Sequence, residues 1–310
     1  MGFYAPAQIV RDAREHGVEV RAPDVNFSSW DSTLEGQGEH PILRLGLREV
    51  DGLREADAKK IKSSKAIPEL HRSGIPVSAL EKLSSADAFR SVGLDRRAAL
   101  WEVKALAKAK PLPLFEFADA HDHGPEEEVI LPEMPLSEHV VNDYQTLKLS
   151  LKAHPMSFLR KHCEIERVTN NARLKHIRNN ALVSVAGIVL VRQRPGSAKG
   201  VVFLTLEDEF SVCNVVIWPQ VLESHRAIVM GARLMLIRGR VQKSNDVLHV
   251  VANSVVDKTP WLALLTVNDA LLKNPQAKAD EVMKHGPDPA PPTARHPRLV
   301  RVIPKSRDFH

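Results

Sequence analysis

Residues 183–191 read VSVAGIVLV, within the most apolar run of the chain, and have the composition of a buried β-strand. The glycine in the middle, Gly187, is suited to a β-bulge. A hairpin follows, in which the runs VVFLTL at 201–206 and VCNVVIW at 212–218 are joined by a tight EDE turn. These stretches predict three consecutive strands.

A helix and two more strands complete this pattern. Pro219 suits the first turn of a helix that we expect to end at Gly231. Two further β runs, at 233–243 and 247–256, flank a short polar turn. Five strands with a helix between the third and the fourth have the order of an OB-fold β-barrel, and we predict that fold for residues 181–258.

Barrels of this kind bind single-stranded nucleic acid in a basic groove with aromatic side chains on which bases stack. The candidates on the predicted strands and around the first turn are Arg192, Arg194, Lys199, Phe203, Trp218, Arg238, Arg240 and Lys243. Phe203 alternates with apolar neighbours, so a place in the core is an alternative for it. Because only two aromatic residues are offered, we expect charge to contribute more than stacking.

The charges of the chain are segregated. There are 43 Lys plus Arg and 38 Asp plus Glu in 310 residues. Residues 44–110 hold 15 basic and 9 acidic side chains, residues 111–143 hold 9 acidic and no Lys or Arg, and residues 144–180 hold 8 basic and 2 acidic. Two basic blocks around an acidic connector favour a nucleic-acid partner, although solvated helix faces alone can produce them.

Two stretches of the first basic block resemble one another. Residues 52–58 (GLREADA) and 93–99 (GLDRRAA) share the spacing Gly-Leu-x4-Ala. In each, a glycine turn after an apolar residue leads into a basic-rich helix. This is the pattern of tandem helix-hairpin-helix motifs, which hold the DNA backbone through N–H groups of the turn and of the helix start, irrespective of base sequence.

The predicted duplex contacts of the hairpins are Gly52, Leu53, Arg54, Lys59, Gly93, Leu94, Arg96 and Arg97. The usual pattern is Gly-apolar-Gly, and here the second glycine is replaced by Arg54 and by Asp95. An aspartate repels phosphate but is a good helix N-cap, so we assign the second contact to Arg96 and Arg97. The alternative is that both glycines only interrupt helices.

Segments outside these two modules give weaker signals. Residues 1–43 predict a helix and an extended stretch at 18–21, without a sheet nearby for that stretch to join. The basic segment 144–180 predicts helices. In the acidic segment, the extended PLPLF motif leaves three residues for a partner's hydrophobic pocket or for packing on neighbouring helices: Leu112, Leu114 and Phe115.

Composition excludes several classes of protein and of site. With 43% apolar and 26% charged residues, the chain is neither collagenous nor wholly disordered. The two cysteines, Cys163 and Cys213, predict buried thiols in a reducing cytoplasm and no disulfide framework. His121 and His123 lack further ligands at helical spacing, so we expect a solvated loop there and no metal site. No apolar run is long enough to cross a bilayer.

Several motifs together resemble one family. The stretches GFYAPAQ (2–8), RLGLR (44–48), VDGL (50–53), LSLKAHP (149–155) and SVAGIVLV (184–191) are similar to the bacterial C-family DNA polymerases. The order of hairpins, connector and barrel matches that family too. Within it the chain most resembles the error-prone branch, the damage-induced relative of the replicative polymerase III alpha subunit, and its closing PKSRDFH resembles the end of that branch.

The resemblance implies an α+β multidomain chain from the carboxy-terminal part of such a polymerase, acting in damage-induced mutagenesis and translesion synthesis. The implied parts are the tail of the fingers region (1–43), the tandem helix-hairpin-helix domain (44–110), an acidic linker (111–143), a basic helical connector (144–180), the OB-fold domain (181–258) and a partly disordered tail (259–310).

The resemblance also limits the expected activity. The family's palm, whose aspartates hold two Mg²⁺ ions, lies upstream of anything in this chain, so we expect no catalytic residue, no metal, no cofactor and no primer extension by the chain alone. The implied partners are primer–template duplex, single-stranded template, the missing polymerase core, the sliding clamp and mutagenesis accessory proteins, with no membrane. Pro111 stands where the clamp-binding peptide begins with Gln.

Three alternatives stay open. A replicative alpha subunit is disfavoured by Pro111 and by the short segment after the barrel. A stand-alone, non-catalytic DNA-binding protein is disfavoured by the order of modules, because in the Holliday-junction binding protein the barrel precedes the hairpins. An RNA-binding barrel would prefer structured RNA over single-stranded DNA in competition.

Overall fold

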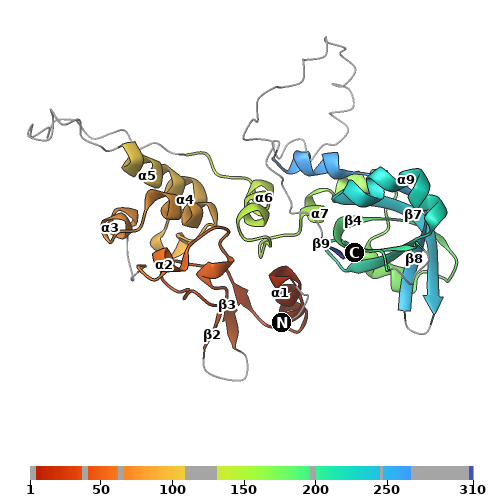
Figure 1. The fold of residues 1–310 in the computed structure, drawn as a ribbon, viewed down its shortest axis with the longest axis horizontal. Helices are drawn as coiled ribbons and strands as arrows, with labels where there is room; N and C mark the ends of the chain where they lie inside the picture. The colour runs from red at the N-terminus through yellow and green to blue at the C-terminus, as the bar shows by residue number, and fades with distance from the viewer. Residues whose placement is uncertain are drawn as a thin grey trace, which may run out of the picture. The chain divides into compact units, whose positions relative to one another are not determined.

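The structure is a computed structural model that describes residues 5–36, 41–61, 66–108, 131–195, 200–244, 247–266 and 307–309. The chain divides into two compact units (Figure 1). The first consists of residues 1–134 and 142–151, and the second of residues 135–141 and 152–310. In the described part of the chain, no helix is long and apolar enough to span a membrane.

The first unit opens with helix α1 (Pro6–Glu15) and a three-stranded sheet. Its strands are β1 (Val20–Arg21), β2 (Thr33–Glu35) and β3 (Ile42–Arg44). β3 lies in the middle, parallel to β1 and antiparallel to β2. The expectation that the extended stretch at 18–21 has no sheet nearby is therefore wrong. β2 and β3 have three residues each, too few to show a period of two.

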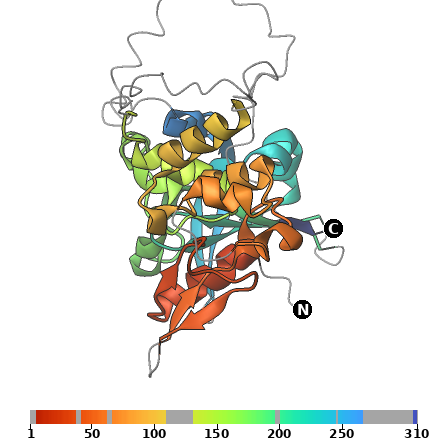
Figure 2. The ribbon, with the colours of Figure 1, turned by 90° about the vertical axis from the view of Figure 1, so that its left-hand side faces the viewer.

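Short helices form the rest of the first unit, above the sheet in both views (Figure 1, Figure 2). They are η1 (Leu47–Glu49), α2 (Glu55–Ala58), α3 (Ile67–Arg72), α4 (Val77–Ser85), η2 (Arg90–Val92) and α5 (Arg96–Lys108). The next helix, α6, spans Leu136–Thr146.

One hydrophobic core holds the first unit together. Val10 of α1 and Val25 belong to the same buried cluster as Leu83 of α4. Leu147 and Leu149, from the segment that returns to this unit, are also members. Residues before and after position 43 thus contribute to a single core, and the burial of their apolar side chains stabilises one body.

Three short helices precede the barrel in the second unit: α7 (Pro155–Phe158), α8 (Arg160–Ile165) and η3 (Asn171–His176). The basic segment predicted to be helical contains α7, which begins at Pro155. Pro155 occupies the first helical turn, and the His154 ring Nδ1 accepts a hydrogen bond from the Met156 N–H at 3.1 Å, which caps the helix.

The barrel has the predicted five strands and one helix. They are β4 (Leu182–Gln193), β5 (Val202–Glu207), β6 (Val212–Ile217), α9 (Pro219–Gly231), β7 (Leu234–Ser244) and β8 (Val247–Asp257). The strand order is β5-β6-β8-β7-β4, and pairing of β4 with β5 closes the barrel. The helix lies between the third and fourth strands along the chain, which confirms the predicted order.

Gly187 has a different role from the one predicted. The irregularity in the β4–β5 register lies between Val189 and Val191, two residues further on. At Gly187 a Cβ atom would lie 2.6 Å from the carbonyl oxygen of Glu207 on β5. The glycine is needed because two backbones approach closely here.

Both cysteines are buried and unpaired, as predicted. Burial raises the pKa of the Cys163 thiol to about 11 and that of the Cys213 thiol to about 12. Both therefore stay protonated thiols at neutral pH.

After the barrel, the described residues form two elements. The 3-10 helix η5 covers Thr259–Thr266, and strand β9 (Arg307–Phe309) pairs in parallel with residues 191–193 of β4. The rest of the predicted tail lies outside the described residues.

Candidate nucleic-acid interface

The first hairpin turns at Gly52, whose φ of 73° is in the left-handed region that glycine adopts without strain. The turn is closed by the Leu53 N–H, which donates to the carbonyl of Val50 at 3.1 Å. Leu53 is buried, so it anchors the turn in the core and does not face a ligand. Gly52 and Arg54 are exposed.

Two lysines that the sequence patterns did not single out lie beside this turn. The Lys82 ammonium of α4 donates to the carbonyl of Gly52, and the Lys148 ammonium contacts a carboxylate oxygen of Asp51 at 2.6 Å. Lys59 is exposed but forms an ion pair with Glu55 at 2.7 Å, and that hydrogen bond raises the pKa of Lys59. Because Lys148 is ion-paired with Asp51 as Lys59 is with Glu55, the positive charge offered at the turn comes mainly from Arg54 and Lys82.

The second hairpin turns at Gly93, with a φ of 82°, and Leu94 packs partly buried against the core. Asp95 caps α5, because its carboxylate accepts a hydrogen bond from the Ala98 N–H at 2.7 Å. Its predicted role as an N-cap is confirmed. Arg97 is half-buried and donates to the carbonyl of Pro132 at 2.6 Å.

The predicted phosphate contact of Arg96 needs correction. Its side chain is 1% exposed, and its guanidinium pairs with the Asp143 carboxylate at 2.5 Å. The other oxygen of Asp143 accepts from the Ser150 hydroxyl at 2.8 Å. This charge is neutralised inside the first unit, where a buried cation needs a partner.

In the barrel, the outer face of β5 and β6 carries both predicted aromatic residues. Phe203 is half-buried between the fully buried Val202 and Leu204, so it points outward and is not a core residue. It lies opposite Val216, which places Trp218 at the diagonal position on the same face. Trp218 is 54% exposed. The structure places the two side chains on the same outward face of β5 and β6.

The two arginines at the end of β4 differ. Arg192 is 5% exposed, and its guanidinium donates to the carbonyls of Val229, at 2.7 Å, and Ala232 at the end of α9. It satisfies helix-end carbonyls, so its predicted role in the binding groove needs correction. Arg194 is exposed, and its guanidinium lies beside Gly200, at the start of the segment that leads into β5.

The basic residues of β7 form a separate group. Arg238 and Arg240 are exposed. Arg238 lies 3.4 Å from Glu166, whose pKa is lowered chiefly by its hydrogen bond with Lys258. The Arg240 guanidinium donates to the carbonyl of Asn180 at 3.1 Å. β8 lies between β7 and β6, so this group is about 10 Å from the aromatic face.

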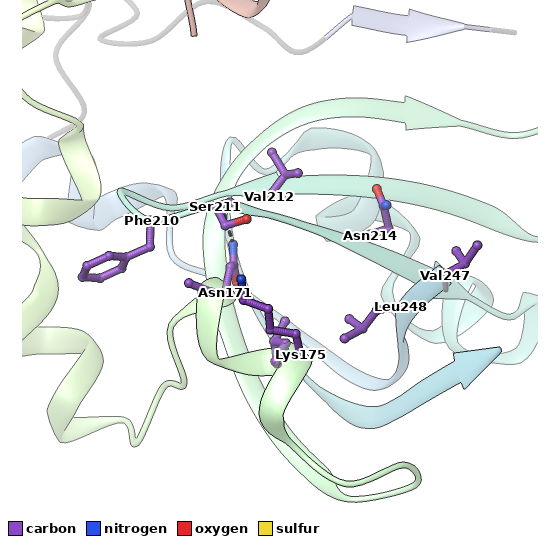
Figure 3. Close-up of a pocket in the computed structure, with 10 residues that line it drawn as sticks. Asn171, Lys175, Phe210, Ser211, Val212, Asn214, Val247 and Leu248 are labelled. Atoms are coloured by element: carbon purple, nitrogen blue, oxygen red, sulfur yellow. Dashed lines mark hydrogen bonds between the residues drawn. The ribbon is translucent and has the colours of Figure 1, made fainter. Parts of the chain in front are cut away.

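Two hollows flank η3, and sequence patterns predicted neither. One, of about 400 Å³, is shared with β6 and β8 and includes Lys175, Phe210 and Asn214 (Figure 3). The other, of about 630 Å³, is lined by Arg160, Glu164, Arg167, Val168, Thr169, Asn170, Arg173, His176 and Ile177. The one sequence feature that could have pointed to this region is the stretch between Glu166 and Glu207, which has seven Lys or Arg and no Asp or Glu.

Several predicted residues lie outside the described part of the chain: Lys199, Leu112, Leu114, Phe115, Pro111, His121 and His123. Among the residues that the structure does describe, no three His, Cys, Asp or Glu side chains form a group that could hold a metal ion.

Two family models match the chain. The helix-hairpin-helix motif matches residues 17–99, and the OB-fold nucleic acid binding domain matches residues 183–257. These matches confirm the predicted fold class, a helix-hairpin-helix domain followed by an OB-fold domain. The roles of individual side chains in binding stay predictions.

Relatives match the whole chain. An "Error-prone DNA polymerase" of Rhodopseudomonas palustris (strain BisA53) is 46% identical over 100% of this chain and 30% of its own length. An "Error-prone DNA polymerase 1" of Rhizobium meliloti (strain 1021) is 43% identical over 100% of this chain and 32% of its own length. The chain thus spans about a third of these relatives, and the predicted resemblance is confirmed. Among solved structures, asparaginyl-tRNA synthetase from Pyrococcus horikoshii covers 38% of this chain and 32% of its own, with 18% identity and a TM-score of 0.26.

Proposed function

We propose that this chain, similar along its whole length to part of the error-prone DNA polymerases, is the carboxy-terminal DNA-binding portion of such an enzyme and acts in damage-induced mutagenesis and translesion synthesis. The observation that carries the proposal is the joint occurrence of helix-hairpin-helix and OB-fold domains, in that order, in a chain that matches these relatives along all of its own length at 43–46% identity. Nucleotidyl transfer and its Mg²⁺ ions are assigned to residues beyond this chain.

In this proposal the first unit holds the primer–template duplex by its phosphates. Gly52 presents a turn backbone at the surface, Arg54 and Lys82 place positive charge beside it, and the Asp51-paired Lys148 lies next to them. Contacts of this kind attract phosphate without reading the bases, which suits an enzyme that must bind any template.

The barrel guides the single-stranded template. Phe203 and Trp218 offer ring faces to unpaired bases, and the exposed Arg194, which lies beside Gly200 ahead of β5, attracts the backbone. Stacking on aromatic rings tolerates any base, and a damaged base also has a ring face in many cases. The proposed partners beyond DNA are the remainder of the polymerase, accessory proteins and the sliding clamp, and the proposed location is the cytoplasm.

Binding of the full chain to a primer–template duplex and to a single-stranded oligonucleotide, each at several salt concentrations, tests this division. Replacing Lys82 and Lys148 together by alanine should weaken duplex binding and reduce its salt slope by up to about 1.8, because each lost phosphate contact removes about 0.9. Lys104→Ala, at an exposed lysine elsewhere on the first unit, is the matched control.

In the barrel, Phe203→Leu with Trp218→Leu should weaken single-strand binding more than duplex binding, while the salt slope stays the same. Arg238→Ala with Arg240→Ala should also cost more on the single strand than on the duplex. Equal losses on both substrates would contradict the guiding role of the barrel. Preference for structured RNA in competition would favour an RNA-binding function instead.

A further inference from the structure

We propose that the hollow between η3 and the first residues of β6 and β8 is a subsite for one unpaired nucleobase and the phosphate attached to it. This inference rests on the proposed single-strand binding by the barrel and specifies where the strand goes after it leaves the β5–β6 face.

The shape and lining of the hollow suit a base. Figure 3 shows it bounded by η3, by the β5–β6 turn and by the start of β8. Its volume of about 400 Å³ lies in the range of small-molecule sites. One wall is apolar, with Val212, Val247 and Leu248, and its ten lining residues include no acidic side chain.

An aromatic ring is held in place at one end. Phe210 is 56% exposed, and the Arg160 guanidinium lies 5.3 Å from its ring centre. Arg160 is itself fixed by hydrogen bonds of 2.6 and 2.5 Å to Glu209. A ring fixed before binding loses little conformational freedom when a base stacks on it, which favours affinity.

The turn that carries this ring is rigid. The Asp208 carboxylate accepts hydrogen bonds from the N–H groups of Phe210 and Ser211, both at 2.9 Å, and from the Asn171 N–H at 2.8 Å. The Asn171 side-chain amide donates to the carbonyl of Ser211 at 3.1 Å. The turn and η3 therefore hold the two sides of the hollow at a fixed separation.

Charge selects a nucleic acid strand as the occupant. Lys175 is exposed at the rim, and the Lys243 ammonium lies beside it, donating to the Lys175 carbonyl at 2.7 Å. The adjoining turn carries Glu207, Asp208 and Glu209, but the Asp208 and Glu209 carboxylates pair with Arg160 and none of the three lines the hollow. A ring for stacking next to cations for phosphate matches a polyanion whose units carry flat rings.

The hollow is continuous with the proposed stacking face. Asn214 lines it and accepts a hydrogen bond from the Thr205 hydroxyl at 3.2 Å across β5 and β6. Thr205 is the next outward-facing residue after Phe203 on β5. A strand that stacks on Trp218 and Phe203 and continues along this face reaches the hollow.

Photocross-linking of the full chain to an oligonucleotide of 5-iodouracil, mapped by tandem mass spectrometry, tests the site. We expect a cross-link at Phe210 in addition to those at Phe203 and Trp218. Phe210→Leu should lower single-strand affinity about tenfold without changing the salt slope, since a stacked base is lost but no phosphate contact. Lys175→Ala should reduce that slope by about 0.7.

The controls separate this site from the proposed function. Phe27→Leu, at a 60% exposed ring with Arg44 5.4 Å from its centre in the first unit, should leave single-strand affinity unchanged. Cross-links confined to Phe203 and Trp218, with Phe210→Leu binding like Phe27→Leu, would overturn the subsite while single-strand guidance stands. Equal affinity for a wholly abasic strand, or equally strong competition by polyglutamate, would show a general anion site and also overturn it. Absence of any single-strand binding would refute the proposed function itself.

Discussion

Replacing Arg96 by methionine should destabilise the first unit and leave the salt dependence of DNA binding unchanged. Arg96 and Asp143 are 1% and 2% exposed and lie 2.5 Å apart, so the substitution removes the cationic partner of a buried carboxylate, which keeps its hydrogen bond from the Ser150 hydroxyl. Removing one partner of a buried pair costs about 3–5 kcal/mol. At an m value of about 2 kcal/mol/M, the urea midpoint falls by about 2 M.

Hydrogen exchange of the intact chain in urea measures this loss unit by unit, because amides of α5 report on the first unit and amides of β4 report on the barrel. The double variant Arg96→Met with Asp143→Leu should recover most of the stability, since no unpaired charge stays buried. A folded Arg96→Met chain whose duplex-binding slope falls by about 0.9 would refute the reasoning, because it would show that Arg96 contacts a phosphate.

Three further outcomes follow from the second unit. Gly187→Ala should destabilise the barrel by about 1–3 kcal/mol, because the added methyl meets a β5 carbonyl at 2.6 Å; an unchanged melting temperature would contradict that contact. Cys163 and Cys213, with pKa values raised to about 11 and about 12, should resist iodoacetamide at pH 8 until the chain is unfolded, and rapid labelling of the native chain would disprove their burial. The hydrogen bond with Lys258 is the chief cause of the lowered pKa of Glu166, so the ionised carboxylate stabilises the fold above the unfolded-state pKa of about 4.3, and this stabilisation is lost as the pH falls through the lower folded-state pKa. Urea titrations should therefore find Glu166→Gln less stable than the parent by up to about 1 kcal/mol at pH 7 and equally stable near pH 2. A stability difference that does not change with pH would count against this ion pair.

The barrel was predictable because each of its strands is long enough to show its own pattern. The five runs from residue 182 to residue 257 appear as strands within one or two residues of the predicted bounds. The turns at Gly52 and Gly93 were predictable as well, since each needs a positive φ that few other residues adopt. The small sheet was not, because β2 and β3 have three residues each and are stable only beside one another.

The sequence could not show which arginine and lysine side chains are buried and bonded to other groups of the protein. Arg96 pairs with a carboxylate 47 positions away, and Arg192 binds helix-end carbonyls 37 and 40 positions away. Lys82 and Lys148 show the converse case. No sequence motif includes them, and only the folded structure brings them to the Gly52 turn. A local pattern identifies the type of binding module, whereas contacts between distant residues decide which side chains face a ligand.

The core of the first unit includes Leu147 and Leu149, which follow helix α5 by about forty positions. During synthesis, α1 through α5 therefore leave the ribosome well before the residues that complete their core. Over that interval part of the apolar surface stays open to water and to chaperones. At about 5–20 residues per second the delay is about 2–8 s, so the nascent chain must stay soluble for seconds before this unit reaches its full stability.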